Sequence, residues 1–146
     1  MKRIVRSAIV EHKAEEMFAL VDDIEAYPQF LPWCTGTTVH ERTAQGTRAT
    51  LTIGMRGLRQ SFTTQNEYRP GESIDMRLLK GPFRHFAAAW RFKPLSPQAC
   101  SIELSLEYEL SGALARILAR LFDQIADTMV DAFTRRADKV YGGHSD

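Results

Sequence analysis

The stretch SGALARILARLFDQIADTMVDAFTRRADKVY (residues 111–141) decides the fold, because it has the pattern of one long amphipathic helix. Apolar residues recur at steps of three and four, which places them on one helical face. This face comprises Leu114, Leu118, Leu121, Ile125, Met129, Ala132 and Val140, widened by Ile117, Phe122 and Phe133. The opposite face carries Asp123, Asp127, Asp131, Arg135 and Lys139, with acids before bases as the helix dipole favours.

The length of this helix is unusual for so short a chain. At 1.5 Å per residue it would extend about 45 Å, more than a small domain spans. We therefore expect an irregular first turn or a kink near Leu114. Gly142-Gly143 should end the helix, because glycine favours helix C-termini.

The rest of the chain predicts a sheet. Apolar and polar residues alternate through most of it, as in Ile102, Leu104 and Leu106 with charged or small residues between them. The expected strands cover residues 2–10, 37–43, 47–55, 58–68, 74–78, 86–92 and 102–110. Such alternation is typical of antiparallel strands with one covered face. We predict an α+β domain: a curved antiparallel sheet of about seven strands around the long C-terminal helix, with two short helices after the first strand.

The segment after the first strand has a different pattern. Residues 11–21 follow a short helical period, which continues for a turn or two through residues 22–26. The string YPQFLPWC (residues 27–34) then has two prolines four residues apart, which exclude a regular helix or a central strand. Four of its eight residues are large and apolar. We expect them to pack against the rest of the domain, because exposing them would be costly.

The composition favours one ordinary globular domain. The chain has 146 residues, enough for a substantial core, and we expect a single domain over residues 1–146 with a tail from about 142. The net charge is +1, with 19 basic and 18 acidic side chains distributed throughout. No basic stripe is present, so we expect no DNA partner. The apolar start is too short for a signal or membrane segment, and Cys34 and Cys100 suit a reducing cytoplasm.

Catalytic and metal-binding motifs are absent from the sequence. No serine or cysteine lies in a nucleophile motif, and the four histidines lack metal-ligand spacing, so we predict neither catalytic residues nor a metal site. Polar residues within the apolar rows are more informative, because buried polar groups need partners. Gln60, Thr64, Asn66 and Tyr108 either satisfy one another internally or orient the carbonyl or hydroxyl group of a ligand.

Several stretches together resemble one known family. They are VDDIEAYPQFLPWC (residues 21–34), Gly81-Pro82-Phe83 followed by residues 90–92, and residues 129–137 in the final helix. The chain resembles the ubiquinone-binding START-like family, also called the polyketide cyclase/dehydrase-like or oligoketide cyclase family. This family includes mitochondrial coenzyme Q chaperones and RatA-like ribosome-association toxins. The resemblance implies the helix-grip fold, with a tunnel between helix and sheet for a hydrophobic ligand.

The tunnel would be lined by apolar residues from the helix, the inner sheet face and the proline-rich segment. The candidates are Phe30, Trp33, Leu51, Ile53, Phe62, Met76, Trp90, Leu106, Leu121, Ile125 and Met129. The resemblance implies that ubiquinone or a similar lipid is the ligand and that no cofactor is required. Exchange with a membrane would need an opening, near residues 54–58, 81–83 or 114–122. Arg56, Arg59, Lys80 and Arg84 flank two of these turns, as a solvated rim or as contacts to lipid phosphates.

Three functions follow as hypotheses. The first is a noncatalytic carrier of ubiquinone or another lipid that supports respiration or quinone synthesis, in the cytoplasm or peripherally at the inner membrane. The second is a RatA-like toxin that binds the large ribosomal subunit and blocks subunit association, with the basic residues of the last helix as contacts. The third is a polyketide cyclase or aromatase, for which Tyr108, His40 and His85 are the only loosely suitable groups.

Overall fold

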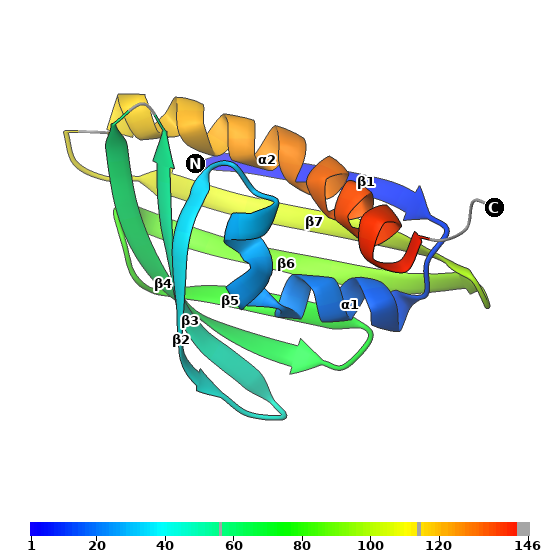
Figure 1. Cartoon of the computed structure of the whole chain (residues 1–146). Coiled ribbons are helices and arrows are strands. Elements are labelled where there is room, and N and C mark those ends of the chain that lie inside the picture. Colours follow the sequence, from blue (N-terminus) through cyan, green and yellow to red (C-terminus); the bar gives the residue numbers. More distant parts are fainter. Residues whose placement is uncertain (56, 114, 143–146) are drawn as a thin grey trace.

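The computed structural model describes residues 1–55, 57–113 and 115–142 and shows a curved sheet with a long helix across its concave face (Figure 1). The strands are β1 (Lys2–Val10), β2 (Cys34–Arg42), β3 (Gly46–Met55), β4 (Leu58–Arg69), β5 (Ser73–Lys80), β6 (Phe83–Ser96) and β7 (Ala99–Leu110). The helices are α1 (Ala14–Asp22), the 3-10 helix η1 (Ile24–Gln29), α2 (Ala115–Ala137) and the π-helical turn η2 (Asp138–Gly142). The predicted α+β helix-grip fold is confirmed.

The sheet is antiparallel throughout, in the order β1-β7-β6-β5-β4-β3-β2. Strands β2 to β7 are joined in chain order by hairpin connections. The first strand, β1, forms the sheet edge beside the last strand, β7. Register shifts interrupt the ladders, for example between Thr63 and Thr64 and between Phe83 and His85. Such bulges bend and twist strands. The sheet therefore curves around α2 and encloses one of its faces.

The final helix is shorter than the sequence predicts. α2 begins at Ala115, and after Ala137 the chain widens into the π-helical turn. Its 23 residues extend about 35 Å at 1.5 Å per residue, which is shorter than the roughly 45 Å expected from the sequence. The irregular first turn or kink is predicted near Leu114, which lies outside the described residues, as does Gly143 of the predicted stop. The π-helical turn ends at Gly142, the other residue of that stop. Two of the acids on its outer side are not free: Asp123 pairs with Lys2 at 3.1 Å and Asp127 with Arg6 at 2.7 Å.

Several strand boundaries also differ from the predicted ones, and the structure gives a reason for two of them. Strand β2 begins at Cys34, three residues before the predicted start, because it pairs with the end of β3 across a bulge. Strand β6 continues through Pro94, where the sequence predicts a turn. Pro94 pairs with Cys100 of β7, while the ladder with β5 ends at Arg91. A proline is tolerated there because the other edge of β6 has no strand partner to which an N–H could donate.

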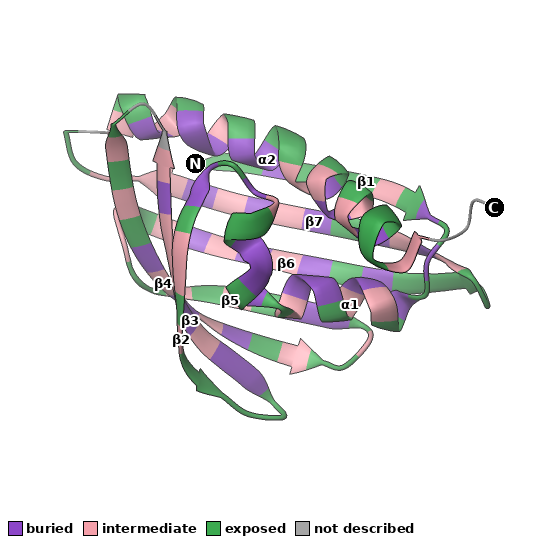
Figure 2. Ribbon diagram, in the orientation of Figure 1, coloured by how far each residue is buried: buried purple, intermediate pink, exposed green. Residues whose placement is uncertain are grey.

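The core lies between α2, α1, η1 and the concave face of the sheet. Buried and exposed positions alternate along the strands and recur along α2, as expected for elements covered on one side (Figure 2). Gly81 shows how tightly the β5–β6 turn is packed, since a Cβ atom there would lie 2.6 Å from Cβ of Phe62. Among the described residues, no helix has the length and hydrophobicity needed to cross a bilayer.

Candidate ligand-binding cavity

A cavity of about 70 Å³ lies between α2 and the concave face of the sheet. Its floor is formed by paired residues on neighbouring strands. Asn66 of β4 pairs with Met76 of β5, Met76 pairs with Ala88 of β6, and Ala88 pairs with Leu106 of β7. These four side chains point the same way because paired residues in a sheet share a face. The cavity is therefore a consequence of the curvature of the sheet.

Most of the predicted tunnel residues line this cavity. They are Trp33, Leu51, Ile53, Phe62, Met76, Trp90, Leu106, Ile125 and Met129, with Thr64 and Asn66 of the polar set. They come from the η1–β2 connection, from β3 to β7 and from one stripe of α2. The structure thus brings them together around one space, and their role in holding a ligand stays a prediction.

Eight further lining residues were not predicted. They are Ile24, Tyr27, Phe86, Ala88, Leu104, Phe122, Ala126 and Phe133. Most belong to the same periodic rows as predicted members: Phe86 and Ala88 precede Trp90 at steps of two, and Phe133 follows Met129 by four. Periodicity could therefore have identified most of these lining residues. It does not predict the position of η1, which brings Ile24 and Tyr27 to the cavity.

Leu121 and Phe30 lie elsewhere. The lining stripe of α2 comprises residues 122, 125, 126, 129 and 133. Leu121 is buried, but it projects roughly 100° from Phe122 around the helix, to one side of this stripe. Phe30 is half-buried and packs edge-on against Phe133, with a centroid distance of 5.2 Å, so it lies outside the cavity in a groove on the surface.

Gln60 and Tyr108 are also outside the lining. Gln60 is half-buried near the start of β4 and does not line the cavity, although its register partner Ile53 does. Tyr108 is buried, but its hydroxyl donates to Oδ1 of Asp123 on α2 at 2.7 Å. Burial, together with this carboxylate, raises the pKa of the Tyr108 phenol. Its hydroxyl therefore joins helix to sheet.

The polar part of the cavity is the pair Thr64 and Asn66. The Thr64 hydroxyl donates to Oδ1 of Asn66 at 2.8 Å, and both side chains are buried. Within the described parts of the chain, the amide nitrogen of Asn66 has no hydrogen-bond partner. An otherwise apolar cavity thus contains one free donor group, which can bind a carbonyl or hydroxyl oxygen of a ligand.

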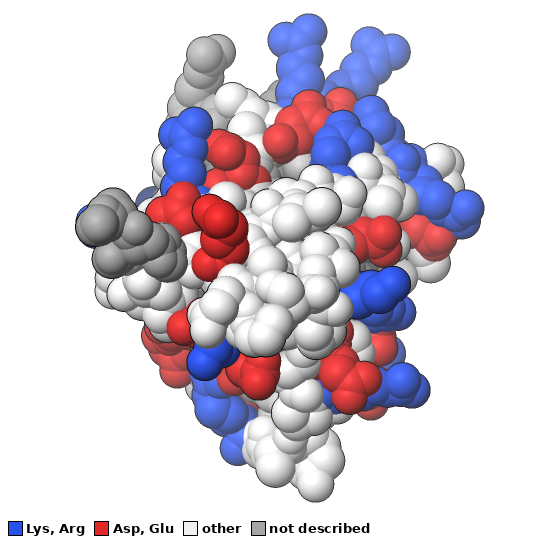
Figure 3. All heavy atoms as spheres, turned by 90° about the vertical axis from the view of Figure 1, so that its right-hand side faces the viewer, with Lys and Arg blue, Asp and Glu red and all other residues white. Residues whose placement is uncertain are grey.

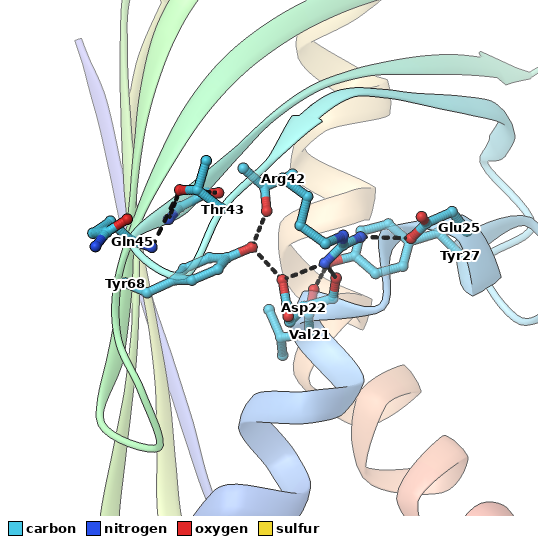
Figure 4. A network of polar contacts seen from close by, with 10 residues as sticks. Val21, Asp22, Glu25, Tyr27, Arg42, Thr43, Gln45 and Tyr68 are labelled. Atoms are coloured by element: carbon cyan, nitrogen blue, oxygen red, sulfur yellow. Dashed lines mark hydrogen bonds and ion pairs between the residues drawn. The ribbon is translucent and has the colours of Figure 1, made fainter.

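A polar network fixes η1 beside the cavity (Figure 4). Arg42 of β2 donates to Asp22 at 3.0 Å and to Glu25 at 2.7 Å. The Tyr68 hydroxyl of β4 also donates to Asp22, and burial together with this bond raises the pKa of Tyr68 to about 12. Tyr27 donates to the carbonyl oxygen of Val21. The chain between α1 and η1 is thereby held on the sheet, which places Tyr27 at the cavity.

The histidines proposed as loosely suitable for catalysis do not converge. His40 contacts the Thr50 hydroxyl at 2.7 Å in an exposed position, and His85 contacts Glu107 at 3.2 Å; neither lines the cavity. His12 is buried and contacts Asp138 of η2 at 2.7 Å. In the described part of the chain, no cluster of three metal-ligating side chains occurs.

Charge is distributed unevenly around the cavity. Arg59 and Lys80 are exposed near the ends of β4 and β5, and neither has an ion-pair partner among the described residues, whereas Arg84 pairs with Glu109 at 3.7 Å. Arg56, the fourth predicted rim residue, lies outside them. At the opposite end of the molecule, acids and bases are mixed around an uncharged area (Figure 3). The net charge of +1 is therefore the sum of regions that differ in their local charge.

A curved sheet that grips one helix around an apolar cavity defines the helix-grip, START-like class. The chain belongs to the family described as polyketide cyclase / dehydrase and lipid transport, whose sequence profile matches residues 10–134. It is 43% identical to the ribosome association toxin RatA of Vibrio cholerae, over 97% of this chain and 99% of that protein.

Two further similarities concern a more distant relative and a solved structure. The coenzyme Q-binding protein COQ10 homolog B of Xenopus laevis mitochondria is 29% identical, over 93% of this chain and 58% of that protein. The crystal structure of the Zhui aromatase/cyclase from Streptomyces superposes with a TM-score of 0.86, covering 99% of this chain and 98% of that chain. At 14% sequence identity, that likeness shows the fold alone.

Proposed function

We propose that the protein is a noncatalytic carrier or chaperone for a hydrophobic ligand with an oxygen-bearing head, such as ubiquinone. The observation that carries this proposal is the cavity, whose lining is apolar except for Thr64 and Asn66. The family profile, which includes lipid transport, and the coenzyme Q-binding relative support it. Such a role requires no cofactor.

The lining gives a physical basis for affinity. Each buried CH₂ group contributes about 0.8 kcal/mol, so an isoprenoid or acyl chain binds well without specific polar contacts. The free amide donor of Asn66 then selects ligands that have an oxygen acceptor near one end of the chain. Neither His40 nor His85 lines the cavity, so we propose no reaction.

The cavity is too small for such a ligand without movement. Its 70 Å³ has room for about two water molecules, whereas sites for drug-sized ligands have about 300–1,000 Å³. Loading must therefore displace α2 or the η1–β2 connection from the sheet. Hydrophobic ligands can supply the free energy for this opening, because a ligand shifts a conformational equilibrium by its differential affinity for the two states.

Intrinsic fluorescence offers a direct test. The chain has two tryptophans, Trp33 and Trp90, and both line the cavity. Titration with a short-chain ubiquinone should change their emission saturably at one ligand per protein. Organic extraction of the purified protein, followed by mass spectrometry, should identify a quinone or lipid. An absence of extracted lipid together with an unsaturable titration would reject the carrier function.

A second candidate function is association with the ribosome. The relative named ribosome association toxin RatA supports it, because the similarity covers almost the full length of both chains. On α2, Arg116 and Arg120 are exposed and form no ion pair among the described residues, so they are available to RNA phosphates. In this role the protein would bind the large subunit and block subunit association.

Sucrose gradients distinguish this function from the first. Overexpression of the protein should shift intact ribosomes toward free subunits. The variant Arg116→Glu/Arg120→Glu should lose the shift, and Lys93→Glu, an exposed change on the β6–β7 hairpin, should retain it. Unchanged subunit association on overexpression would count against the ribosomal role without affecting the carrier proposal.

A further inference from the structure

A second hollow of about 560 Å³ lies on the surface, beside the cavity. It runs between the end of η1 with the η1–β2 connection (residues 29–33) on one side and one flank of α2 and η2 (residues 124–139) on the other, and we call it the outer groove. One side comes from the proline-rich string and the other from the end of the long helix, and both belong to the stretches that carry the family resemblance. The carrier function as proposed above does not use the outer groove.

Arg136 is held in the outer groove by an aromatic ring and an amide. Its guanidinium carbon lies 4.9 Å from the centroid of the Phe30 ring, and one Nη donates to Oε1 of Gln29 at 3.0 Å. Its buried Nε atom has no hydrogen-bond partner in the described chain. The contacts orient the guanidinium without neutralising it, because neither Phe30 nor Gln29 carries a charge.

The balance of charge in the outer groove is positive. Asp131 pairs with Arg135 at 3.0 Å, so these two side chains offset each other. Arg136 and Lys139 have no carboxylate partner among the described residues, which leaves two cations. Arginine binds carboxylate and phosphate groups through two parallel N–H donors, and lysine adds a point charge. The outer groove thus complements an oxyanion.

Trp33 connects the outer groove to the cavity. Its side chain is 5% exposed and contributes to the lining of both spaces. Phe133 lies on the cavity side and packs edge-on against Phe30 on the groove side, with 5.2 Å between the ring centroids. A movement of Trp33 would therefore join the polar outer groove to the apolar interior.

We propose that the outer groove binds the carboxylate or phosphate head of an amphiphile whose apolar chain lies in the cavity. Arg136 and Lys139 bind the oxyanion, and the chain passes Trp33. This inference rests on the carrier function and extends its ligands from neutral heads such as that of ubiquinone to anionic amphiphiles, whose head lies in the outer groove. Fatty acids and isoprenyl phosphates present the same head chemistry, so the test includes both.

The test compares ligands that differ only in the head. Tryptophan emission is used to titrate the protein with oleate and oleyl alcohol, and with farnesyl phosphate and farnesol, all below their micelle concentrations. We expect the anionic member of each pair to bind about 10- to 100-fold more tightly, as charged hydrogen bonds allow. The preference should shrink as salt is raised, because salt screens exposed charges.

Two variants locate the preference. Lys139→Gln removes an exposed cation that forms no hydrogen bond or ion pair among the described residues, so it should leave the fold intact. It should reduce the preference for the anionic ligand several-fold. Arg136→Gln should abolish most of it, with the unfolding midpoint measured in parallel because Arg136 also holds Phe30. Lys93→Gln, far along the sheet, is the matched control and should retain the full preference.

The possible failures are distinguishable. Equal binding of acid and alcohol in both pairs would overturn the anionic head site and leave the carrier function standing. Binding of neither member would contradict the carrier function itself. Tighter binding of a short single-stranded RNA than of either amphiphile would also overturn the proposal, because the outer groove would then recognise an anion without an apolar chain.

Discussion

The two halves of the interface between α2 and the sheet are packed differently. Beneath the first half, Phe83 is surrounded by the rings of Phe62, Phe86, Tyr108 and Phe122, with centroid distances of 4.9 to 6.4 Å. We call these five residues the aromatic cluster. Beneath the second half, the floor includes small or flexible side chains such as Ala88 and Met76, and a cavity remains.

This difference shows how one amphipathic helix can have two roles. Interlocked rings fill the space of the aromatic cluster and hold α2 on the sheet. Around the cavity, the same apolar stripe meets smaller partners and leaves space that a ligand can enlarge. Phe62, Phe86 and Phe122 belong both to the aromatic cluster and to the cavity lining, whereas Phe83 belongs to the cluster alone. We therefore expect changes at Phe83 to affect stability, and changes at residues that line only the cavity to affect binding.

The largest expected effect is that of Phe83→Ala. Phe83 is buried in the aromatic cluster but does not line the cavity, so its removal should cost about 3–5 kcal/mol of unfolding free energy. Ligand affinity of the folded fraction should change less than threefold. Urea denaturation with and without ligand measures both quantities. A loss of affinity larger than the loss of stability would mean that Phe83 itself belongs to the binding site.

Leu121→Ala should also act on stability alone. Leu121 is buried beside the lining stripe, so the variant should lose about 2–4 kcal/mol and retain its affinity. The sequence alone places Leu121 in the tunnel lining and therefore predicts the opposite result, in which a polar substitution there reduces ligand uptake more than it reduces stability. Thermal unfolding and tryptophan titration of the same sample decide between the two. Selective loss of binding would restore Leu121 to the site.

Ala88→Leu should have the opposite signature. Ala88 lines the cavity, and a leucine there fills much of its space. Stability should remain within about 1.5 kcal/mol of the wild type, because the added carbons enter an existing void. Affinity for a quinone or a fatty acid should fall at least tenfold. Wild-type affinity in this variant, at unchanged stability, would show that ligands do not use the cavity.

The polar pair gives a smaller effect with a built-in control. Asn66→Leu leaves the Thr64 hydroxyl buried without its acceptor and should cost about 1–3 kcal/mol. The double variant Thr64→Val/Asn66→Leu should recover most of this loss. Both variants should discriminate less between a quinone and a plain hydrocarbon. Retained discrimination would mean that Asn66 does not bind the head of the ligand.

The smallest effect concerns pH. Hydrogen bonds from Tyr108 and Lys2 lower the pKa of the Asp123 carboxyl, even though partial burial opposes the shift. A lowered carboxyl pKa stabilises the fold above the unfolded value and loses this contribution as pH falls through the folded value. Tyr108→Phe should therefore cost about 1 kcal/mol at pH 7.

The difference between Tyr108→Phe and wild type should shrink below about pH 4, where carboxyl groups begin to protonate. Urea midpoints measured from pH 3 to pH 7 test this dependence. A difference that is constant across this range would mean that Tyr108 stabilises the fold by packing alone. Loss of ligand affinity at neutral pH would instead place its hydroxyl in the site.

Much of the fold was predictable because it depends on local periodicity. The alternation of Ile102, Leu104 and Leu106 identified β7, and the spacing from Leu118 to Phe133 identified α2 and the side it buries. Strand ends were less predictable: β6 continues through Pro94 only because β5 has already ended, which is a property of the assembled sheet.

The candidate site was predictable only in part. Residues such as Ile53 and Trp90 belong to rows of alternating apolar residues that face the cavity, so the strand periodicity is enough to predict their position. Tyr108 is in the right row, but its hydroxyl reaches Asp123, fifteen residues along the chain. The outer groove depends on Arg136 meeting Phe30 across more than a hundred residues, and no local pattern encodes that contact.

We propose that the space between α2 and the sheet holds a hydrophobic ligand. The decisive experiment is native mass spectrometry of the wild-type protein and Ala88→Leu, purified in parallel and supplied with the same quinone or fatty acid. We expect a one-to-one complex for the wild type and little or none for Ala88→Leu. Equal complex formation by both, or none by the wild type, would refute a ligand site in this space.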